Sequence, residues 1–413
     1  AQALRLTNGC SQIKVTNCDL LGKNATLSQT AGIAINGVET AFEPTSSGKI
    51  EIRNNYISGF ANGVLCISDS IKNKSRSHKI VGNIINSYYG FGLYFLETDS
   101  VSILENKITE ARSGSGSALK LASCNASRLA ANEVVNYGKF GFELIKENKR
   151  SSTQTVITNN MIGGKSSFKD SSQASIGLAL ETGTRNVRVW HNTVVYNSTN
   201  HPNYSSGATH VPSPVRFSGT QNCDVRNNLF INNSTSAKSA AFVSNGSTFS
   251  WLDYNNYYSS KSKTVVYDGF SITSLDKWQN LKRSINQHSF SEKVDFVSST
   301  NLHLSKKKAS PRGVNLSVIN DFDVEKRCSL APSIGADESE YPAAKPKVFF
   351  AVNDTVYLNS PLTIYTSALR LNATKHKWLV DGKDAGNALH LEYRFTKTGT
   401  YEIKLISENC SGL

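Results

Sequence analysis

Along residues 1–260, short stretches of alternating apolar and polar residues end in one recurring phrase. The phrase is an apolar residue, two spacers, Asn, one spacer and a second apolar residue, as in Ile52-Arg-Asn-Asn55-Tyr-Ile57. Its copies stand on average about 29 residues apart, a period typical of repeat proteins whose units must stack to bury their apolar faces. The Asn positions are Asn55, Asn83, Asn106, Asn132, Asn160, Asn192, Asn228 and Asn255.

A second periodic feature precedes each phrase. Short strands such as Leu119-Lys-Leu121 and Phe142-Glu-Leu144 recur, and another strand directly precedes the Asn phrase, as in Ile50-Glu-Ile52. Successive side chains of a strand point to opposite faces, so the first and third residues should point inward and the middle residue should face solvent. Each repeat therefore predicts at least two strands. We expect an all-β fold in which residues 1–260 form a right-handed parallel β-helix of about nine or more coils.

Asn at the corner of each coil has two expected roles. It tolerates the left-handed backbone conformation of a tight bend. With coils stacked at about 4.8 Å, the amide of one Asn can also bond to the next along the axis. We therefore predict a structural asparagine ladder. An earlier copy of the phrase has Cys18 at the key position.

Beyond residue 260 the pattern changes. Ser274–Arg283 predicts a short amphipathic helix with Ser274 as its N-cap. We expect residues 261–341 to form the last coil or coils and the C-terminal cap of the β-helix, and residues 342–346 to form a linker. Residues 347–413 contain seven or so short alternating stretches, which predict a β-sandwich.

Two parts of the chain resemble known families. The order Asn255-Asn-Tyr-Tyr258, a Trp-bearing helix, Leu302-His-Leu304 and Ser333-Ile-Gly-Ala-Asp-Glu338 resembles the closing segment of secreted bacterial right-handed parallel β-helix repeat proteins of the pectate-lyase-like superfamily. The pair Lys377-Trp-Leu-Val-Asp-Gly382 and Gly399-Thr-Tyr-Glu-Ile-Lys-Leu405 resembles the polycystic-kidney-disease (PKD) type of immunoglobulin-like domain. The two resemblances imply a secreted or cell-surface bacterial protein.

Charge and composition narrow the partners. The net charge of +13 is spread along the chain, whereas nucleic-acid-binding proteins gather Lys and Arg into patches, so we expect no nucleic-acid partner. A diffuse positive charge suits an acidic polysaccharide or an anionic cell surface, such as a cell-surface glycan, and solubility alone explains it equally well. The chain has no apolar run of about 18 residues, so we expect no membrane insertion. Both ends look cut, which predicts neighbouring domains of a longer chain.

The seven cysteines form no CxxC motif and no metal-ligand spacing. Cys66 occupies an inward strand position and is expected in the core. Cys10 and Cys18 could pair, and any partner of Cys410 is expected beyond the last residue. We predict no metal site, no disulfide-held fold and no cofactor. Calcium is the one candidate ion, and no clear ligand set accompanies it.

The middle residues of the first strands form an outward column. Tyr94, Lys120 and Glu143 should lie on successive coils, about 5 and 10 Å apart, with Arg216 two coils further on. β-Helix polysaccharide lyases, by resemblance, use such a face: a base removes the proton next to a uronic carboxylate, and calcium or Arg stabilises the anion. Lys120 would be the base, Arg216 the carboxylate partner, and Glu143, with Glu147 or Glu181, would lie near a cation.

Two features count against catalysis. A carboxylate beside Lys120 favours the protonated amine, which cannot act as a base. The strand faces also lack the Asp pair that β-helix hydrolases use. Solvated surface residues with incidental charge pairing, and a non-catalytic glycan groove, are the alternatives.

Histidines and loops supply the remaining candidates. The insertion Asn197–Pro214 carries His201, Tyr204 and His210, and binding residues are common on loops that leave a rigid scaffold. The two His residues could bind a metal, but loop His residues usually have no such role. His191, next to a ladder Asn, is expected to be a surface corner residue.

Two functions follow. The preferred one is a non-enzymatic module of a large secreted or cell-surface bacterial protein, acting as a stiff adhesin or glycan-binding spacer. The alternative is a polysaccharide lyase acting on an acidic, uronic-acid glycan. The alternative rests on fold resemblance, which is a weak basis for assigning a function.

Overall fold

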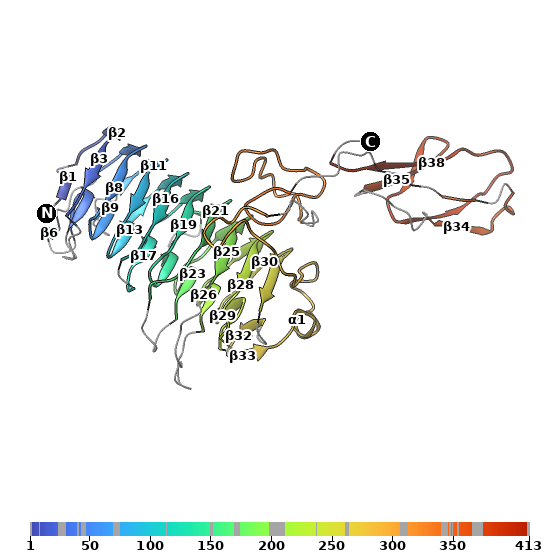
Figure 1. Ribbon diagram of the computed structural model, residues 1–413. Coiled ribbons are helices and arrows are strands. Elements are labelled where there is room, and N and C mark those ends of the chain that lie inside the picture. Colours follow the sequence, from blue (N-terminus) through green and yellow to red (C-terminus); the bar gives the residue numbers. More distant parts are fainter. Residues whose placement is uncertain are drawn as a thin grey trace. The chain divides into compact units, whose positions relative to one another are not determined.

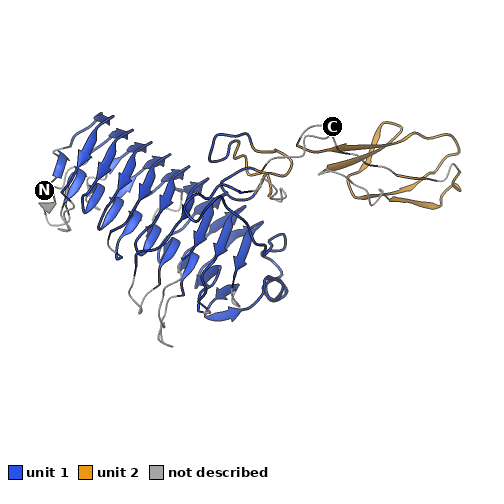
Figure 2. Ribbon diagram, viewed as in Figure 1, with its two compact units in different colours: residues 1–309, 320–326, 334–338 blue, residues 310–319, 327–333, 339–413 orange. Residues whose placement is uncertain are grey.

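A computed structural model forms two compact units, shown in Figure 2. Unit 1 holds residues 1–309, 320–326 and 334–338, and unit 2 holds residues 310–319, 327–333 and 339–413. The linker predicted at 342–346 lies outside the described residues except for Pro346. The structure describes the whole chain apart from residues 1, 8, 24–29, 39–40, 43–46, 69–74, 113, 149–151, 169–173, 198–210, 237, 261–263, 306–312, 340–345, 347, 349, 353–354, 366–374 and 411–413.

Unit 1 is a parallel β-helix built from three long sheets, whose strands stack coil upon coil in Figure 1. Each full coil gives one strand to each sheet. Sheet 1 contains β1 (Gln2–Leu6), β4 (Ala31–Ile35), β9 (Asn62–Ile67), β13 (Phe91–Leu96), β17 (Ser117–Ala122), β20 (Phe140–Ile145), β23 (Ile176–Glu181), β26 (Ser213–Ser218), β29 (Phe242–Asn245), β32 (Val265–Tyr267) and β33 (Phe270–Ile272).

Sheets 2 and 3 hold nine strands each and lie on the two sides of the Asn corner. Sheet 2 contains β2 (Lys14–Thr16), β7 (Glu51–Arg53), β11 (Lys79–Val81), β15 (Ser102–Leu104), β18 (Arg128–Ala130), β21 (Thr155–Thr158), β24 (Val187–Trp190), β27 (Cys223–Arg226) and β30 (Phe249–Asp253). Sheet 3 contains β3 (Asp19–Leu21), β8 (Tyr56–Ser58), β12 (Ile84–Asn86), β16 (Lys107–Thr109), β19 (Glu133–Val135), β22 (Met161–Gly163), β25 (Thr193–Tyr196), β28 (Leu229–Asn232) and β31 (Asn256–Ser259).

The long parallel sheets confirm the predicted stacking of repeats, with one addition. The residues after each Asn form a strand of their own, so each full coil has three strands, where at least two were predicted. In the three long sheets only the last pair, β32 and β33, is antiparallel. Two short pairs lie beside them: β5 (Gly37–Val38) with β6 (Ala41–Phe42), and β10 (Ser75–Arg76) with β14 (Thr98–Asp99).

The interior of unit 1 is a continuous apolar core. Alternate strand residues point inward and are fully buried, such as Leu119 and Leu121 in β17 and Phe142 and Leu144 in β20. Cys66 is also fully buried, as its inward position predicts. This burial is typical of parallel sheets, whose strands are rich in apolar residues because other elements cover them.

The ladder Asn residues form a file of hydrogen bonds through the interior. From Asn55 to Asn255, each side-chain Nδ2 donates to the Oδ1 of the next Asn, at 2.9–3.0 Å. The backbone N–H of each Asn donates to the same oxygen. At the first coil the N–H of Cys18 donates to Asn55 Oδ1 at 3.0 Å. At most 2% of the surface of any of these eight Asn residues is exposed.

The left-handed backbone conformation falls one residue earlier than expected. The residue before the ladder Asn has a positive φ in every coil, including Glu105 (58°), Ala131 (52°) and Tyr254 (55°). Gly82 (φ 65°) takes this place in one coil, where a Cβ would meet the side chain of Asn54 at 2.6 Å. The prediction that the ladder Asn itself bends the backbone is therefore wrong. Its amide fixes the corner, and its predecessor makes the bend.

A helix closes the C-terminal end of the stack. Helix α1 (Leu275–Leu281) begins at the predicted N-cap, because the Ser274 side chain accepts a hydrogen bond from the backbone N–H of Lys277. Trp278 is fully buried, with its ring centroid 5.3 Å from that of Phe242 and 5.4 Å from that of Tyr257. The aromatic cluster covers the last inward side chains, as an open solenoid end requires.

The segments after α1 that belong to unit 1 lie elsewhere. Leu302, Leu304, Ile334 and Ala336 form a second buried cluster with outward side chains of sheet 3, such as Leu229. The backbone N–H of Ala336 donates to Thr193 Oγ1 at 2.9 Å. The closing segment thus covers the outer face of sheet 3, while α1 covers the end of the stack.

Unit 2 is built from antiparallel strands. β34 (Pro361–Tyr365) pairs with β37 (His390–Arg394), and β36 (Lys383–Gly386), β35 (Lys375–Val380) and β38 (Ile403–Glu408) form a second sheet. Its core contains Trp378, which is fully buried and donates from Nε1 to the carbonyl of Ala388 at 3.1 Å. The hydroxyl of Tyr401 donates to the carbonyl of Lys397 at 2.8 Å.

The cysteines differ from the sequence prediction. Cys328 and Cys410 form a disulfide within unit 2 across 82 residues of sequence, with a Cα–Cα distance of 5.5 Å. Cys410 therefore has its partner inside the chain, not beyond its last residue. Cys10 and Cys18, predicted as a potential pair, are both free. Spacing alone missed the bond because residues distant in sequence are brought together only by folding.

Among the described residues, no helix is both long and apolar enough to span a bilayer.

Candidate functional site

The candidate catalytic column is assembled in the register that its spacing predicts. Tyr94 pairs with Lys120, and Lys120 with Glu143, on adjacent strands of sheet 1. Ala179 follows in the same row and Arg216 comes next, two coils beyond Glu143. The four side chains therefore project from one row along the outer face of β13, β17, β20 and β26, which we call the Lys120 row.

Burial distinguishes this face from an exposed surface. Tyr94 is 8% exposed, Glu143 7% and Arg216 6%. The expectation that these side chains face open solvent is therefore wrong. They point away from the core, yet they lie in a second buried layer above sheet 1. Buried charges of this kind need partners, because an isolated charge in a poorly solvated site is costly.

Each charge in the row has a partner of opposite sign. The Nζ of Lys120 lies 3.4 Å from Glu143 Oε2, which also accepts a 2.6 Å hydrogen bond from the hydroxyl of Ser117. Arg216 donates from Nε to Glu181 Oε1 at 3.0 Å and pairs with it through Nη2. The predicted base, Lys120, and the predicted carboxylate partner, Arg216, are therefore each paired with a carboxylate of the chain itself, Glu143 and Glu181.

Aromatic rings surround the same cations. The Nζ of Lys120 lies 5.5 Å from the ring centroid of Phe91 and 5.7 Å from that of Tyr94. The guanidinium of Arg216 lies 5.6 Å from the ring centroid of Phe140. Cation–π contacts at these distances hold both side chains against the rings. Ser117, Phe91 and Phe140 were not singled out from the sequence, although all three lie in one neighbouring row of the same strands.

The chemistry available to the row follows from this pairing. A Lys that removes a proton must be neutral when substrate arrives. Lys120 instead lies against the Glu143 carboxylate and two aromatic rings, so its amine is already engaged by side chains of the protein. The Lys120 row is therefore a layer of paired charges and aromatic rings on the outer face of sheet 1.

Glu147, one candidate for the cation site, lies at a different corner. It is fully buried, and its Oε1 accepts hydrogen bonds from Ser127 Oγ and Thr155 Oγ1, each at 2.7 Å. Burial raises the pKa of Glu147 to about 7, against the opposing effect of those two hydroxyls. The side chain therefore belongs to the interior of the solenoid and not to the Lys120 row.

Three carboxylates in the closing segment of unit 1 do approach one another. Single oxygens of Asp321, Asp323 and Asp337 lie within 4.8 Å of each other, and His303 Nε2 lies 3.0 Å from Asp323. Carboxylate oxygens suit a hard cation such as Ca²⁺. Backbone amides already occupy part of this set, because Asp337 accepts from the N–H of Leu304 and Asp321 from that of Glu338. The sequence motifs predicted no metal site in this segment.

The histidine candidates have separate outcomes. His201, Tyr204 and His210 lie outside the described residues. His191, expected at the surface, is 1% exposed, and its Nε2 lies 2.9 Å from Asn227 Nδ2. Its place before a ladder Asn turns the ring into the corner, which corrects the surface assignment.

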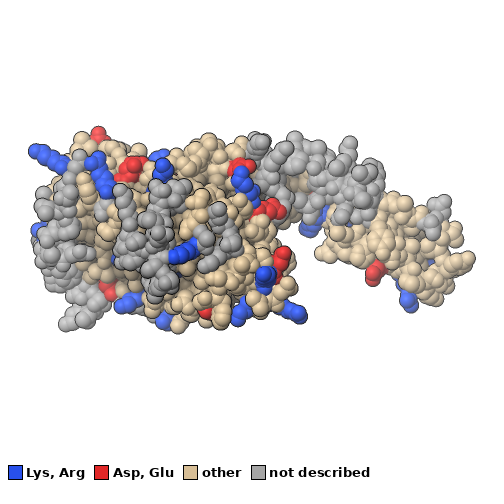
Figure 3. Space-filling model, turned by 60° about the horizontal axis from the view of Figure 1, so that its bottom comes forward, with Lys and Arg blue, Asp and Glu red and all other residues tan. Residues whose placement is uncertain are grey.

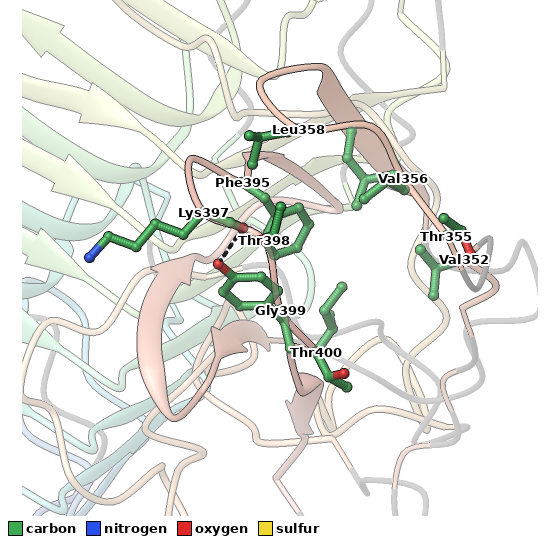
Figure 4. Close-up of a pocket in the computed structure, with 12 residues that line it drawn as sticks. Val352, Thr355, Val356, Leu358, Phe395, Lys397, Thr398, Gly399 and Thr400 are labelled. Atoms are coloured by element: carbon green, nitrogen blue, oxygen red, sulfur yellow. Dashed lines mark hydrogen bonds between the residues drawn. The ribbon is translucent and has the colours of Figure 1, made fainter.

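A hollow of about 540 Å³ lies in unit 2, shown in Figure 4. Val356, Leu358 and Phe395 contribute apolar walls, and the Tyr401–Lys397 hydrogen bond crosses one side. Lys397 is the one ionisable cation among its lining residues. Among the described residues that line it, no set of catalytic groups converges.

Charged side chains on the face shown in Figure 3 are interspersed, with basic and acidic residues near one another. Exposed pairs include Lys107 with Glu133 at 2.8 Å and Lys293 with Asp295 at 2.9 Å. Surface pairs of this kind add little stability. They divide the positive charge of the described surface into small areas.

Comparison of the chain with protein-family models matched none of them, and comparison with curated proteins found no similar sequence.

Proposed function

We propose that this chain is a non-enzymatic module of a larger secreted or cell-surface bacterial protein, a stiff right-handed β-helix that spaces and presents a glycan-binding surface. The observation that carries the proposal is that each charged side chain of the Lys120 row is already paired with a side chain of opposite charge. The residues best placed for lyase chemistry, Lys120 and Arg216, are each paired with a carboxylate and stacked on an aromatic ring.

Stiffness follows from the stack itself. Each coil is joined to the next by three parallel strand pairings and by the amide ladder, so bending the unit would stretch many hydrogen bonds at once. Solenoids with this construction present extended surfaces at fixed spacing, which suits a spacer or adhesin.

We assign unit 2 to the PKD type of immunoglobulin-like sandwich, acting as an extender. Two observations support the assignment. Trp378 is a fully buried Trp on a central strand, and Tyr401 donates its hydroxyl to the carbonyl four residues upstream, as immunoglobulin-like sandwiches do at the corner between two strands. The Cys328–Cys410 disulfide supports a secreted or surface location, because such bonds persist in oxidising compartments.

The competing function is a lyase for a uronic-acid glycan, and one assay separates the two. The protein is incubated with alginate, pectin or chondroitin while absorbance of the unsaturated product is followed. We expect no rise above a blank.

The matched variants are Lys120→Ala and Lys107→Ala, because Lys107 is also ion-paired to a Glu but lies on sheet 3. A rise that Lys120→Ala abolishes and Lys107→Ala preserves would establish the lyase and overturn the proposal.

A further inference from the structure

The four Trp residues of the chain fall into two groups. Trp278 and Trp378 are fully buried in their cores, whereas Trp251 is 59% exposed and Trp190 is partly exposed. Trp190 and Trp251 both lie on the outer face of sheet 2, on β24 and β30. Single exposed aromatic residues are common, but two Trp rings that share the same Arg neighbour form a contiguous aromatic surface, and contiguous apolar surfaces mark interaction sites.

The strand register places two Arg residues beside these rings. Trp190 pairs with Arg226 on the next coil, and Arg188 pairs with Asp224. Asp224 in turn pairs with Trp251. Arg188, Trp190, Arg226 and Trp251 therefore form one continuous surface across the last three strands of sheet 2, which we call the Trp–Arg strip.

A β-bulge sets the direction of Trp251. Cys223 pairs with Phe249, but Asp224 pairs with Trp251, so Ser250 is an extra residue in β30. Phe249 and Leu252 both pack on the core although three positions separate them, which a regular strand would not allow. The bulge keeps both inside and turns Trp251 outward. Bulges often re-aim a side chain at functional surfaces.

The strip is held in place by its own contacts. The guanidinium of Arg226 lies 5.8 Å from the ring centroid of Trp190 and 5.1 Å from that of Trp251. Asp224 fixes this guanidinium through two hydrogen bonds, of 2.7 and 2.6 Å. Arg188 lies 4.7 Å from the Trp190 ring. The surface is therefore preorganised, which lowers the entropy lost on binding.

Sugars fit the chemistry of the strip. The C–H faces of pyranose rings pack on indole rings, while a paired guanidinium and carboxylate can exchange hydrogen bonds with hydroxyls. The two Trp residues are two coils apart, about 10 Å along the axis by strand spacing, a distance that two successive sugar units can span. Arg188 has no ion-pair partner among the residues that the structure describes, which leaves it open to a carboxylate.

Single-stranded nucleic acid also stacks on aromatic rings beside cations. The strip disfavours it, because Asp224 and Asp253 lie at its centre and edge and would repel closely spaced phosphates. Asp224 also cancels the charge of Arg226, which leaves Arg188 as the one uncompensated cation among the described residues of the strip. A polymer with one charge at intervals matches this arrangement better than one with a charge on every unit.

We propose that the Trp–Arg strip binds an acidic heteropolysaccharide in which uronic-acid and neutral pyranose units alternate, with the sugar rings on Trp190 and Trp251 and one carboxylate on Arg188. The inference rests on the glycan-binding part of the proposed function, and it assigns that binding to sheet 2 and not to the Lys120 row of sheet 1.

The test measures binding of unsulfated chondroitin oligosaccharides to the full chain by calorimetry. Trp251→Ala should weaken binding at least about tenfold, because it removes an aromatic platform. Arg188→Gln should weaken binding of the acidic oligosaccharide severalfold while leaving any weak binding of neutral cello-oligosaccharides unchanged. Phe270→Ala is the matched control: Phe270 is 76% exposed and lies on sheet 1, so binding should not change. Circular dichroism confirms that each variant is folded.

Three results would overturn the proposal, and they can be told apart. If Trp251→Ala binds the oligosaccharide as tightly as wild type, the Trp–Arg strip is not the binding site, but the proposed glycan-binding function stands. If the wild-type chain binds none of chondroitin, alginate and pectin, both the assignment of the strip and the glycan-binding function are wrong. Binding of single-stranded oligonucleotides that depends on Trp251, without glycan binding, would assign the strip to nucleic acid.

Discussion

Each coil of unit 1 repeats the contacts that its neighbours make, whereas unit 2 depends on a few contacts between distant residues. In unit 1 seven amide-to-amide hydrogen bonds join eight coils in sequence. In unit 2 five buried side chains form the core, and one disulfide spans 82 residues. Repetition distributes stability along the stack, and a covalent link concentrates it at one point.

The difference teaches where each unit is vulnerable. A repeat protein is approximately a chain of nearest-neighbour interfaces, so a fault in the middle weakens two interfaces together. A small unit of antiparallel strands has a limited core and gains much from a cross-link that restricts its unfolded state. The two units should therefore respond differently to changes in the ladder, the disulfide and pH.

The largest effect is expected from the middle of the ladder. Asn160 donates to Leu129, Thr158 and Asn192, and its Oδ1 accepts two bonds from Asn132. Asn160→Ala removes these five hydrogen bonds from the interior, each with a net worth of about 0.5–1.5 kcal/mol, so we expect the free energy of unfolding of unit 1 to fall by about 5 kcal/mol. Urea unfolding measures it.

The control for this change is Asn233→Ala, because Asn233 is exposed and makes one side-chain hydrogen bond, to Asn197. It should cost under about 0.5 kcal/mol. Equal effects of the two substitutions would show that the ladder adds nothing beyond an ordinary surface amide.

Breaking the disulfide should affect unit 2 alone. Replacing Cys328 and Cys410 by Ser releases a loop of 82 residues, for which we expect a loss of about 2–4 kcal/mol from restriction of the unfolded state. Differential scanning calorimetry should show a lower transition for unit 2. The transition of unit 1 should stay in place, since Cys10, Cys18, Cys66, Cys124 and Cys223 are free.

Adding a thiol reductant to the wild-type chain should reproduce the shift of the double Ser variant. A reductant that moves the transition of unit 1 by the same amount would contradict the assignment of the bond to unit 2.

The smallest effect is a pH dependence confined to unit 1. Burial raises the pKa of Glu147 from an ordinary 4.5 to about 7. The folded state therefore holds this proton more tightly, and ionisation costs stability as pH rises from about 4.5 to 7. Glu147→Gln stays neutral, so relative to wild type it should gain about 3 kcal/mol at pH 8 and little near pH 4.5.

Urea unfolding of both proteins across this pH range gives the difference. Glu105→Gln is the control for the substitution itself, because Glu105 is exposed and its replacement removes no buried carboxyl. A Glu147→Gln difference that is flat with pH would show that Glu147 ionises as an ordinary surface carboxyl.

Repetition explains why much of unit 1 was accessible from the sequence. The same apolar and Asn positions return in each coil, so an error at one repeat is corrected by the others, and the stacked parallel sheets and the helix at Ser274 followed. The third strand of each coil was missed because only three or four residues follow the Asn, too few to show alternation.

The candidate row was predictable in register but not in environment. Strand periodicity places Tyr94, Lys120 and Glu143 in one line, yet it cannot say whether another layer buries them. The Trp–Arg strip was missed because the Ser250 bulge shifts the alternation of β30 by one residue. The Cys328–Cys410 bond was missed for a related reason: nothing periodic connects its two ends.

The ladder spacing has a consequence for how such a chain can change length. Successive ladder residues are separated by as few as 23 and as many as 36 positions, while the amide-to-amide distance stays at 2.9–3.0 Å. All variation is absorbed at the other corners. One coil is thus a self-contained cassette, and gene duplication or excision of a whole cassette would lengthen or shorten the rod while both neighbouring amides still meet.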